Sequence, residues 1–579
     1  MPCREQIVSE EYRDFIVSQL NPNELQNVII KDTCTVNMRF LYDSVYLSKE
    51  SVEPISYGRF SYNSIPKCFA LLDTQAMTEA GIYQIQNYPT LNLQGNGVMI
   101  GFIDTGIDYQ NPIFRNLDGS TRIVGIWDQT VQTGEAPEGF YYGSEYTKEM
   151  IDEALHSENS LRVVPSEDTN SHGTFLASIA AGGANEEDQF IGAAPEATIG
   201  VVKLKEAKQY LKDFYQIHTS APCYQENDIM LGIEYLDRLA RKVNLPLVIC
   251  IALGTNMGGH SSISPLVGLL EIYSNISNRV VVIAAGNEAN QRHHFEGRLL
   301  NNKDKKDVEI RVGETVSGFT MELWTENPNL LEVSLISPSG GTTSRLPLRR
   351  NETFEYRYVF EGTVVDVTYK LFLERSNAEV IIFQLKGPTE GIWKIRVEPV
   401  QVTEGVFHIW LPMREFLNGE TYFLEPNPNT TFTEPGSAIT AMTVGFYNGA
   451  DKSIAISSGR GYTRGNIIKP NFVAPGVNVT GAIRRNQFAQ RTGSSIAAGI
   501  TAGACALLLE WILYQLGEES VDSIQIRNLL LLGTDKKAGE EYPNQEWDME
   551  CSISTRRLMS SGESERVKGE RIWQTFLAN

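Results

Sequence analysis

Cysteine is sparse in this chain, and the cysteines present have no metal-binding arrangement. Seven cysteines are scattered over 579 residues, an odd number with no CxxC pair. His293 and His294 are adjacent and have no further ligands at zinc-binding spacing, which argues against a structural zinc site. We therefore predict reduced thiols, with Cys250 and Cys505 as small core residues, and neither a metal nor a cofactor.

Long apolar runs and clusters of basic residues are also missing. No uninterrupted run of about 18 apolar residues occurs, and the N-terminus, MPCREQIVSEEYRDFIV, lacks the basic and apolar regions of a signal peptide. We expect neither a membrane span nor a signal peptide. Lys and Arg number 50 against 71 Asp and Glu, giving a formal net charge of -21, and this excess argues against a nucleic-acid partner.

The central part of the chain alternates strand-like and helix-like segments. Four apolar segments resemble strands buried on both faces: GVMIGFIDTG (97–106), TIGVVKL (198–204), LPLVICIALG (245–254) and RVVVIAAGN (279–287). Between them, GTFLASIAAGG and DIMLGIEYLDRLARKV have apolar residues at helical spacing. This alternation predicts an α/β fold with a parallel sheet flanked by helices. Active sites of such sheets lie at the carboxyl ends of strands, where Asp104 and Asn287 stand.

The pattern changes after about residue 294. About seven segments with alternating apolar residues predict an antiparallel β-sandwich of about 140 residues, inserted into the α/β unit. The α/β pattern returns near residue 436 and ends in an apolar helix from about Ile496 to Leu516. The first residues form a separate α+β unit, and the last are a charged tail. We divide the chain into residues 1–75, 76–293, 294–435, 436–547 and 548–579.

Asp104 lies in the stretch FIDTGIDY, and its Asp-Thr-Gly triplet has three interpretations. It could be an ordinary turn at a strand end, half of an aspartic-protease pair, or the acid of a serine-protease triad. The aspartic-protease interpretation requires a second such triplet, because two carboxyl groups must share a proton. No second triplet is present, so downstream residues have to decide between the other two.

Two downstream motifs place polar residues at helix starts. His172 begins the helix-like part of NSHGTFLASIAAGG, and Ser495 begins that of RTGSSIAAGITAGACALLLEW. Taken singly, His172 fits a surface or capping residue, and Ser494 or Ser495 fits a helix N-cap. However, Gly173 allows close backbone approach beside His172. A helix N-terminus also offers free N–H groups to an oxyanion that forms where a serine attacks a carbonyl.

A third motif, VVVIAAGNEAN, ends in Asn287. A Gly-Asn turn after a strand is common, but an asparagine amide is also a suitable neutral donor for an oxyanion. The α/β-hydrolase elbow requires a glycine two residues after the nucleophile, where this chain has Ala497. The chain order Asp104, His172, Ser495 is instead that of subtilisin-type proteases.

The motifs together resemble the subtilisin (subtilase) family. The matching segments are DTGID, SHGT, AAGN and GSSIAAG, supported by SSGRG (457–461) and IKPNFVAPG (468–476), within residues of about 90–292 and 436–535. The resemblance implies a serine endopeptidase that acts on protein or peptide substrates. Ser495 would be the nucleophile and His172 the base, Asp104 would orient His172, and Asn287 would bind the oxyanion.

Some positions depart from the family pattern. Ser494 stands where threonine is usual, and Gly499 where the helix commonly has proline. Ala252 replaces a serine in IALGT, but the next two residues, Leu253 and Gly254, would bind substrate through main-chain groups. We therefore expect activity to survive these changes. NQEWDMECSIS lacks the glycine-rich turn expected after the tryptophan.

Within the family, the overall organisation resembles the clostridial Csp proteases of spore germination. That resemblance implies a prodomain at residues 1–75 that acts on its own chain, a jelly-roll-like insert, and cleavage of the zymogen of a spore cortex-lytic hydrolase. The location would be cytoplasmic or spore-associated. LLDTQAMTEAG looks like a prodomain tail, and the predicted autoprocessing bond is Gln75–Ala76.

Two implications of the resemblance stay open at this point. The Csp group also contains catalytically silent pseudoproteases that serve as sensors or scaffolds, although their usual sign is loss of a triad residue. Subtilases can also hold a structural calcium ion, but no acidic loop here is spaced well enough to name ligands.

Overall fold

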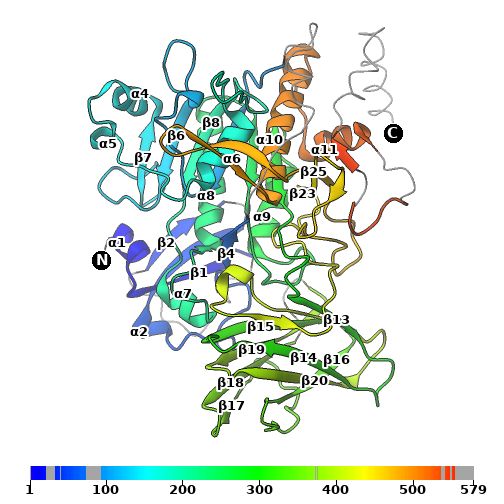
Figure 1. Ribbon diagram of the computed structural model, residues 1–579. Coiled ribbons are helices and arrows are strands. Elements are labelled where there is room, and N and C mark those ends of the chain that lie inside the picture. The colour runs from blue at the N-terminus through cyan, green and yellow to red at the C-terminus, as the bar shows by residue number, and fades with distance from the viewer. Residues whose placement is uncertain are drawn as a thin grey trace.

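The computed structural model describes residues 2–20, 33–39, 41–72, 93–371, 373, 376–535, 541–547 and 551–553 (Figure 1). The predicted bond Gln75–Ala76 lies outside these residues, as does most of the predicted tail, 548–579. Of that tail, β29 (Cys551–Ile553) is described, and it pairs with β28 (Thr534–Asp535).

A nine-stranded, mostly parallel sheet forms the centre of the molecule. Its order is β24-β23-β12-β10-β5-β8-β6-β7, with β25 paired to β23. The bounds are β5 (Met99–Asp104), β6 (Ile123–Asp128), β7 (Ser144–Thr147), β8 (Thr198–Lys203), β10 (Leu247–Ile251), β12 (Arg279–Ala284), β23 (Met442–Asn448), β24 (Ser453–Ile454) and β25 (Phe472–Pro475). The strand pairs β12/β10, β10/β5 and β5/β8 are parallel. The predicted α/β fold is therefore confirmed.

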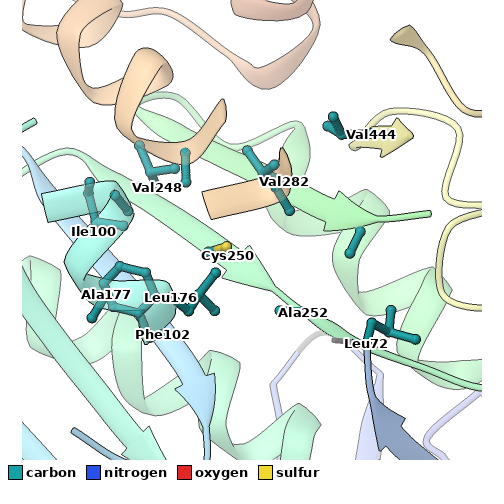
Figure 2. Packing of buried hydrophobic residues seen from close by; sticks show 14 of the residues in the cluster. Leu72, Ile100, Phe102, Leu176, Ala177, Val248, Cys250, Ala252, Val282 and Val444 are labelled. Atoms are coloured by element: carbon teal, nitrogen blue, oxygen red, sulfur yellow. The ribbon is translucent and has the colours of Figure 1, made fainter. Parts of the chain in front are cut away.

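Helices cover both faces of this sheet, because side chains alternate between the faces along each buried strand. The apolar cluster on one face contains Ile100, Val248 and Val282, together with side chains of α6 (His172–Ala181), α10 (Ser494–Glu510) and α11 (Ser523–Leu532) (Figure 2). The opposite cluster contains Ile249 and Val281 with side chains of α8 (Glu226–Lys242) and α9 (Pro265–Ser274).

The helix α10 is nearly all apolar and continues as a π-helical turn, Trp511–Gln515. Together they give a 22-residue helix, Ser494–Gln515, long and apolar enough by composition to cross a membrane. The prediction of no uninterrupted apolar run of about 18 residues still holds, because Glu510 and several polar residues interrupt this helix. Within the described residues it is the one candidate, and 83% of its most apolar window is buried inside the molecule, so it is weak evidence for a span.

Close packing between α10 and α6 explains the small residues of both helices. A Cβ atom added to Gly503 would lie 2.3 Å from Ala193 Cβ and 2.7 Å from the carbonyl oxygen of Ala180. One added to Gly499 would instead meet the ends of the flexible Leu176 and Ile179 side chains at 2.8 and 2.9 Å. Glycine at 503 thus lets the backbones approach.

Residues 294–423 form two antiparallel sheets with one shared apolar cluster. The six-stranded sheet has the order β13-β21-β15-β19-β18-β17, and the four-stranded sheet β16-β20-β14-β22. The bounds are β13 (His294–Arg298), β14 (Lys306–Val312), β15 (Gly318–Glu326), β16 (Leu330–Ile336), β17 (Thr353–Tyr358), β18 (Thr363–Lys370), β19 (Ala378–Lys386), β20 (Gly391–Gln401), β21 (Val406–Trp410) and β22 (Thr421–Phe423). The predicted number of about seven strands is too low, because strands as short as β22 show too little alternation. These strands lie at the bottom of Figure 1, away from α10.

The N-terminal unit contains a small sheet of order β1-β3-β2. Its elements are α1 (Cys3–Val8), β1 (Tyr12–Ser18), β2 (Cys34–Asn37), β3 (Tyr42–Ser48), α2 (Lys49–Val52) and β4 (Cys68–Leu71). β4 is not part of this sheet and lies instead between β11 (Leu253–Gly254) and β9 (Tyr224–Gln225). The end of the N-terminal unit is therefore built into the central domain.

Shorter elements join these parts. They are η2 (Pro112–Phe114), α4 (Lys148–His156), α5 (Ser160–Val163), α7 (Gln209–Phe214), η3 (Arg414–Phe416), β26 (Val479–Ile483) and β27 (Gln487–Arg491).

Cys3 and Cys34 are disulfide-bonded, with Cα atoms 5.1 Å apart. The prediction of reduced thiols is therefore wrong for this pair. The partners are 31 residues apart and meet only because α1 packs against β2, which spacing alone does not reveal. Cys250 and Cys505 are free and buried, as predicted.

Candidate active site

Asp104 and His172 form a buried pair at the carboxyl end of the central strand β5. Asp104 is the last residue of β5 and has no exposed surface, and His172 is the first residue of α6 and is 3% exposed. Nδ1 of His172 lies 2.7 Å from Oδ1 and 2.8 Å from Oδ2 of Asp104. A proton on Nδ1 would thus be shared with the carboxylate, leaving Nε2 as the basic nitrogen of a neutral ring.

Asp168 fixes the start of the helix that carries His172. Its Oδ1 accepts hydrogen bonds from the Thr105 hydroxyl at 2.8 Å and the Ser171 N–H at 2.8 Å, and its Oδ2 accepts from Thr174 N–H and hydroxyl at 2.8 and 2.7 Å. The Thr105 hydroxyl in turn accepts from the Gly173 N–H at 2.9 Å. This network ties the turn after Asp104 to α6. Sequence reasoning missed Asp168, although an acid four residues before a helix-starting histidine is a usable signal.

Ser495 is the second residue of α10 and is 2% exposed. The helix begins at Ser494 and is preceded by Gly493, which makes no side-chain capping bond, so neither serine is the N-cap. The Ser494 hydroxyl instead accepts from the Gly286 N–H at 2.9 Å, and the Ser494 N–H donates to Asn287 Oδ1 at 3.0 Å. These two bonds join the end of β12 to the start of α10.

The orientation of Asn287 follows from its contact with Ser494. Because Oδ1 accepts the Ser494 N–H, the amide oxygen faces α10. The NH2 group at the other end of the amide is the donor. The neighbouring Glu288 is 3% exposed, and its Oε2 lies 3.0 Å from His293 Nδ1 and accepts from Asn256 Nδ2 at 2.8 Å. The turn that carries Asn287 is thus held on both sides.

Leu253 and Gly254 lie opposite an extended segment of the same chain. In the antiparallel pairing of β11 and β4, Leu253 faces Leu71 and Gly254 faces Ala70. On its other side β4 pairs with β9, where Phe69 faces Tyr224. Main-chain pairing on both edges is how an extended peptide binds a cleft. Sequence reasoning missed β9, because a two-residue strand has no recognisable pattern.

Leu72 follows β4 and brings its carbonyl group to the start of α10. Its oxygen accepts the Ser495 N–H at 3.4 Å, and its side chain is 1% exposed. Figure 2 shows Leu72 at the end of β4, in the same apolar cluster as Ala252. A Cβ atom added to Gly254 would lie 3.1 Å from Leu72 Cδ1 and 2.2 Å from Thr433 Oγ1. The Leu72 side chain therefore packs against Gly254, where there is no room for a larger residue.

No group of three or more His, Cys, Asp or Glu side chains that could hold a metal ion occurs among the described residues.

The subtilase family pattern matches residues 95–320 and 418–546. This is more than half of the chain. The chain belongs to the subtilase family. The two matched segments flank most of the inserted sandwich and contain Asp104, His172, Asn287 and Ser495.

Known proteins similar to this chain agree with that assignment. The C5a peptidase of Streptococcus pyogenes is 21% identical over 449 residues, which cover 72% of this chain and 35% of the peptidase. The chain thus spans about a third of the length of that relative. The structure of the Clostridium perfringens CspB protease has a TM-score of 0.74 and 30% identity, covering 83% of this chain and 95% of CspB.

Proposed function

We propose that this subtilase is a serine endopeptidase that hydrolyses peptide bonds through an acyl-enzyme. Ser495 attacks the carbonyl carbon, and His172 takes the proton from its hydroxyl and returns it to the leaving amine. Asp104 holds His172 in one tautomer and stabilises the imidazolium. The Ser495 N–H and the Asn287 amide bind the oxyanion.

The contact between Leu72 and Ser495 carries this proposal. A peptide carbonyl oxygen within 3.4 Å of the Ser495 N–H occupies the position that a substrate carbonyl would take before attack. The preceding residues are extended and pair with β11 and β9, as a bound substrate would be. The chain's own N-terminal unit thus supports the assignment of the cleft.

The same contact supports an autoprocessing role for the N-terminal unit. We place the cleaved bond directly after Leu72 instead of between Gln75 and Ala76, because the Leu72 carbonyl group is the one beside Ser495. The unit that ends there would act as the prodomain of its own chain. The buried Leu72 and Phe69, which are 1% and 2% exposed, further indicate a preference for apolar side chains at the first and fourth residues before the bond.

The biological role proposed here is activation of the zymogen of a spore cortex-lytic hydrolase during germination, in the cytoplasm or the spore. Its support is the likeness in structure to the C. perfringens CspB protease. The presence of Asp104, His172 and Ser495 favours an active enzyme over a silent scaffold.

The test compares the wild type with Ser495→Ala and with Ser520→Ala, an exposed serine. We expect the wild type and Ser520→Ala to yield a fragment with the mass of residues 1–72 and to react with a fluorophosphonate probe. Ser495→Ala should stay full length and unlabelled. A full-length, unlabelled wild type would contradict the proposal, and cleavage of Ser495→Ala would assign the cut to another protease.

A further inference from the structure

The bound strand continues beyond β4 to Lys67, the sixth residue before the bond that follows Leu72. The Glu226 N–H donates to the Lys67 carbonyl oxygen at 2.9 Å. The Lys67 N–H donates to Glu226 Oε2 at 3.2 Å. Glu226 therefore extends the pairing of β9 by one residue and uses its carboxylate as the acceptor.

The Glu226 carboxylate is fully buried at the first residue of α8. Its Oε1 accepts the Leu266 N–H at 3.1 Å, and its Oε2 lies 3.8 Å from the Lys67 ammonium. Among the described residues, Lys67 supplies the one cation within 4.0 Å of this carboxylate. A buried carboxylate is costly unless a cation or hydrogen bonds compensate it, so Lys67 matches what this position requires.

A simpler explanation is that Glu226 only offsets the dipole of α8, as acids in a first helical turn often do. That explanation accounts for neither the bond from the Lys67 N–H to the carboxylate nor the buried lysine. Lys67 is 1% exposed, although its ammonium also donates to the Tyr62 carbonyl oxygen at 3.0 Å and lies 4.3 Å from the Tyr62 ring centroid.

We propose that Glu226 is a specificity-determining residue that selects lysine or arginine as the sixth residue before the cleaved bond. This inference rests on the proposed function, since it takes the bond after Leu72 as the reference. The substrate would then be an extended polypeptide with a basic sixth residue, an apolar fourth residue and a leucine-like first residue. Recognition would span six residues, and Glu226 would bind the positive charge of the sixth.

The first test measures autoprocessing in the full chain during cell-free synthesis. We expect Lys67→Met and Glu226→Gln each to slow appearance of the 1–72 fragment about tenfold, because each change removes one charge of the buried ion pair. Lys67→Arg should process at the wild-type rate, and the double variant no more slowly than either single variant. The control Glu206→Gln alters an acid whose side chain is 61% exposed and should have no effect.

Additive effects in the double variant would overturn the proposal, because Lys67 would then act through Tyr62 within the N-terminal unit. The melting temperature of each variant is measured in a chain that also carries Ser495→Ala, so that no cleavage occurs. A normal melting temperature then shows that slow processing is not caused by poor folding.

The second test uses peptides in trans. The peptide Lys-Ser-Phe-Ala-Leu-Leu reproduces residues 67–72 with serine in place of Cys68 and carries a fluorogenic amide at its C-terminus. It is compared with the same peptide in which norleucine replaces lysine. We expect kcat/KM to favour lysine about tenfold in the wild type and less than about twofold in Glu226→Gln. A wild-type ratio near one, or an equal ratio in both proteins, would overturn the inference.

The proposed function and this inference fail differently. If the wild type is neither processed nor active on either peptide, both are rejected. If processing requires Ser495 but does not depend on the charge at Lys67 or Glu226, the inference alone is rejected. If the peptides are not cut although processing occurs, the processing rates of the single and double variants decide whether the inference about Glu226 holds.

Discussion

At the scale of single residues, the site depends on main-chain groups held by side chains. Ser494 accepts from Gly286 and donates to Asn287, so one residue joins the turn after β12 to the start of α10. A serine suffices for this role, because the hydroxyl oxygen and the backbone N–H make the bonds. Serine in place of the family's threonine is therefore compatible with both bonds.

Asn287→Ala should remove one oxyanion donor while leaving the triad in place. Losing such a donor typically costs about 3 kcal/mol of transition-state stabilisation, or a fall of about 10²- to 10³-fold in rate. The rate of appearance of the 1–72 fragment measures this. Asn290→Ala, which alters an exposed asparagine, serves as the control. A change of less than about tenfold in Asn287→Ala would remove Asn287 from the oxyanion site.

Sequence reasoning found the residues that stand in recognisable motifs, and missed those that act through contacts distant in sequence. Asp104 and Asn287 stand at or just after the end of a strand. His172 and Ser495 are among the first two residues of a helix, so the neighbouring residues identify all four. Leu72 contacts Ser495 and Lys67 contacts Glu226 because β4 lies between β11 and β9. No local sequence pattern indicates this placement. The disulfide between α1 and β2 depends in the same way on packing of the N-terminal unit.

At the scale of elements, the strands β5, β8, β10 and β12 were predictable because they are buried on both faces and therefore apolar along their whole length. Short elements such as β9 and β11 were not, since two residues carry no periodicity. The helix α10 illustrates a different limit. Its composition alone fits a membrane span as well as a core helix, and only its burial against α6 and β12 distinguishes them.

Two glycines of α10 should respond differently to alanine. Alanine favours a helix interior over glycine by about 1 kcal/mol. At Gly503 a Cβ would meet the Ala180 backbone carbonyl and Ala193, so overpacking should destabilise the fold by about 1–3 kcal/mol. At Gly499 the flexible ends of Leu176 and Ile179 can move aside, and the net change should be near zero. Thermal melting in the Ser495→Ala background measures both. Equal melting temperatures would contradict the close approach of α6 and α10.

At the scale of the whole molecule, the inserted sandwich joins the catalytic part through buried histidines. The His260 ring stacks on Trp410 of β21 with centroids 4.2 Å apart, and the His294 ring of β13 stacks on Trp410 at 4.7 Å. His294 Nε2 lies 3.0 Å from His408 Nδ1. Burial lowers the pKa of His260 to about 3 and that of His294 to about 4. These rings are therefore neutral in the folded protein at neutral pH.

The two histidines of this junction favour unfolding in mild acid. Below the ordinary histidine pKa of about 6.5 the unfolded chain binds protons, whereas the folded rings stay neutral until about pH 4 for His294 and pH 3 for His260. The unfolded state thus holds more protons across this window, and stability falls as pH decreases, by about 1.4 kcal/mol per pH unit for each histidine. Burial raises the pKa of Glu434 and of Glu415 to about 7 and that of Glu379 to about 8, and these acids act in the opposite sense. The contribution of a histidine is therefore the difference in slope between its variant and the wild type.

Removing one of these histidines should therefore lower the slope of stability against pH. His294→Gln is expected to lower stability at pH 7, because the stacking on Trp410 is lost. It should also reduce the slope of the unfolding free energy between pH 6.5 and 4 by about 1.4 kcal/mol per pH unit, the value for one proton. Melting temperatures at pH 7, 6 and 5 in the Ser495→Ala background supply the slopes. The matched control is His156→Gln, an exposed histidine away from the junction. If both variants lower the slope equally, the buried histidines are not the source of this pH dependence.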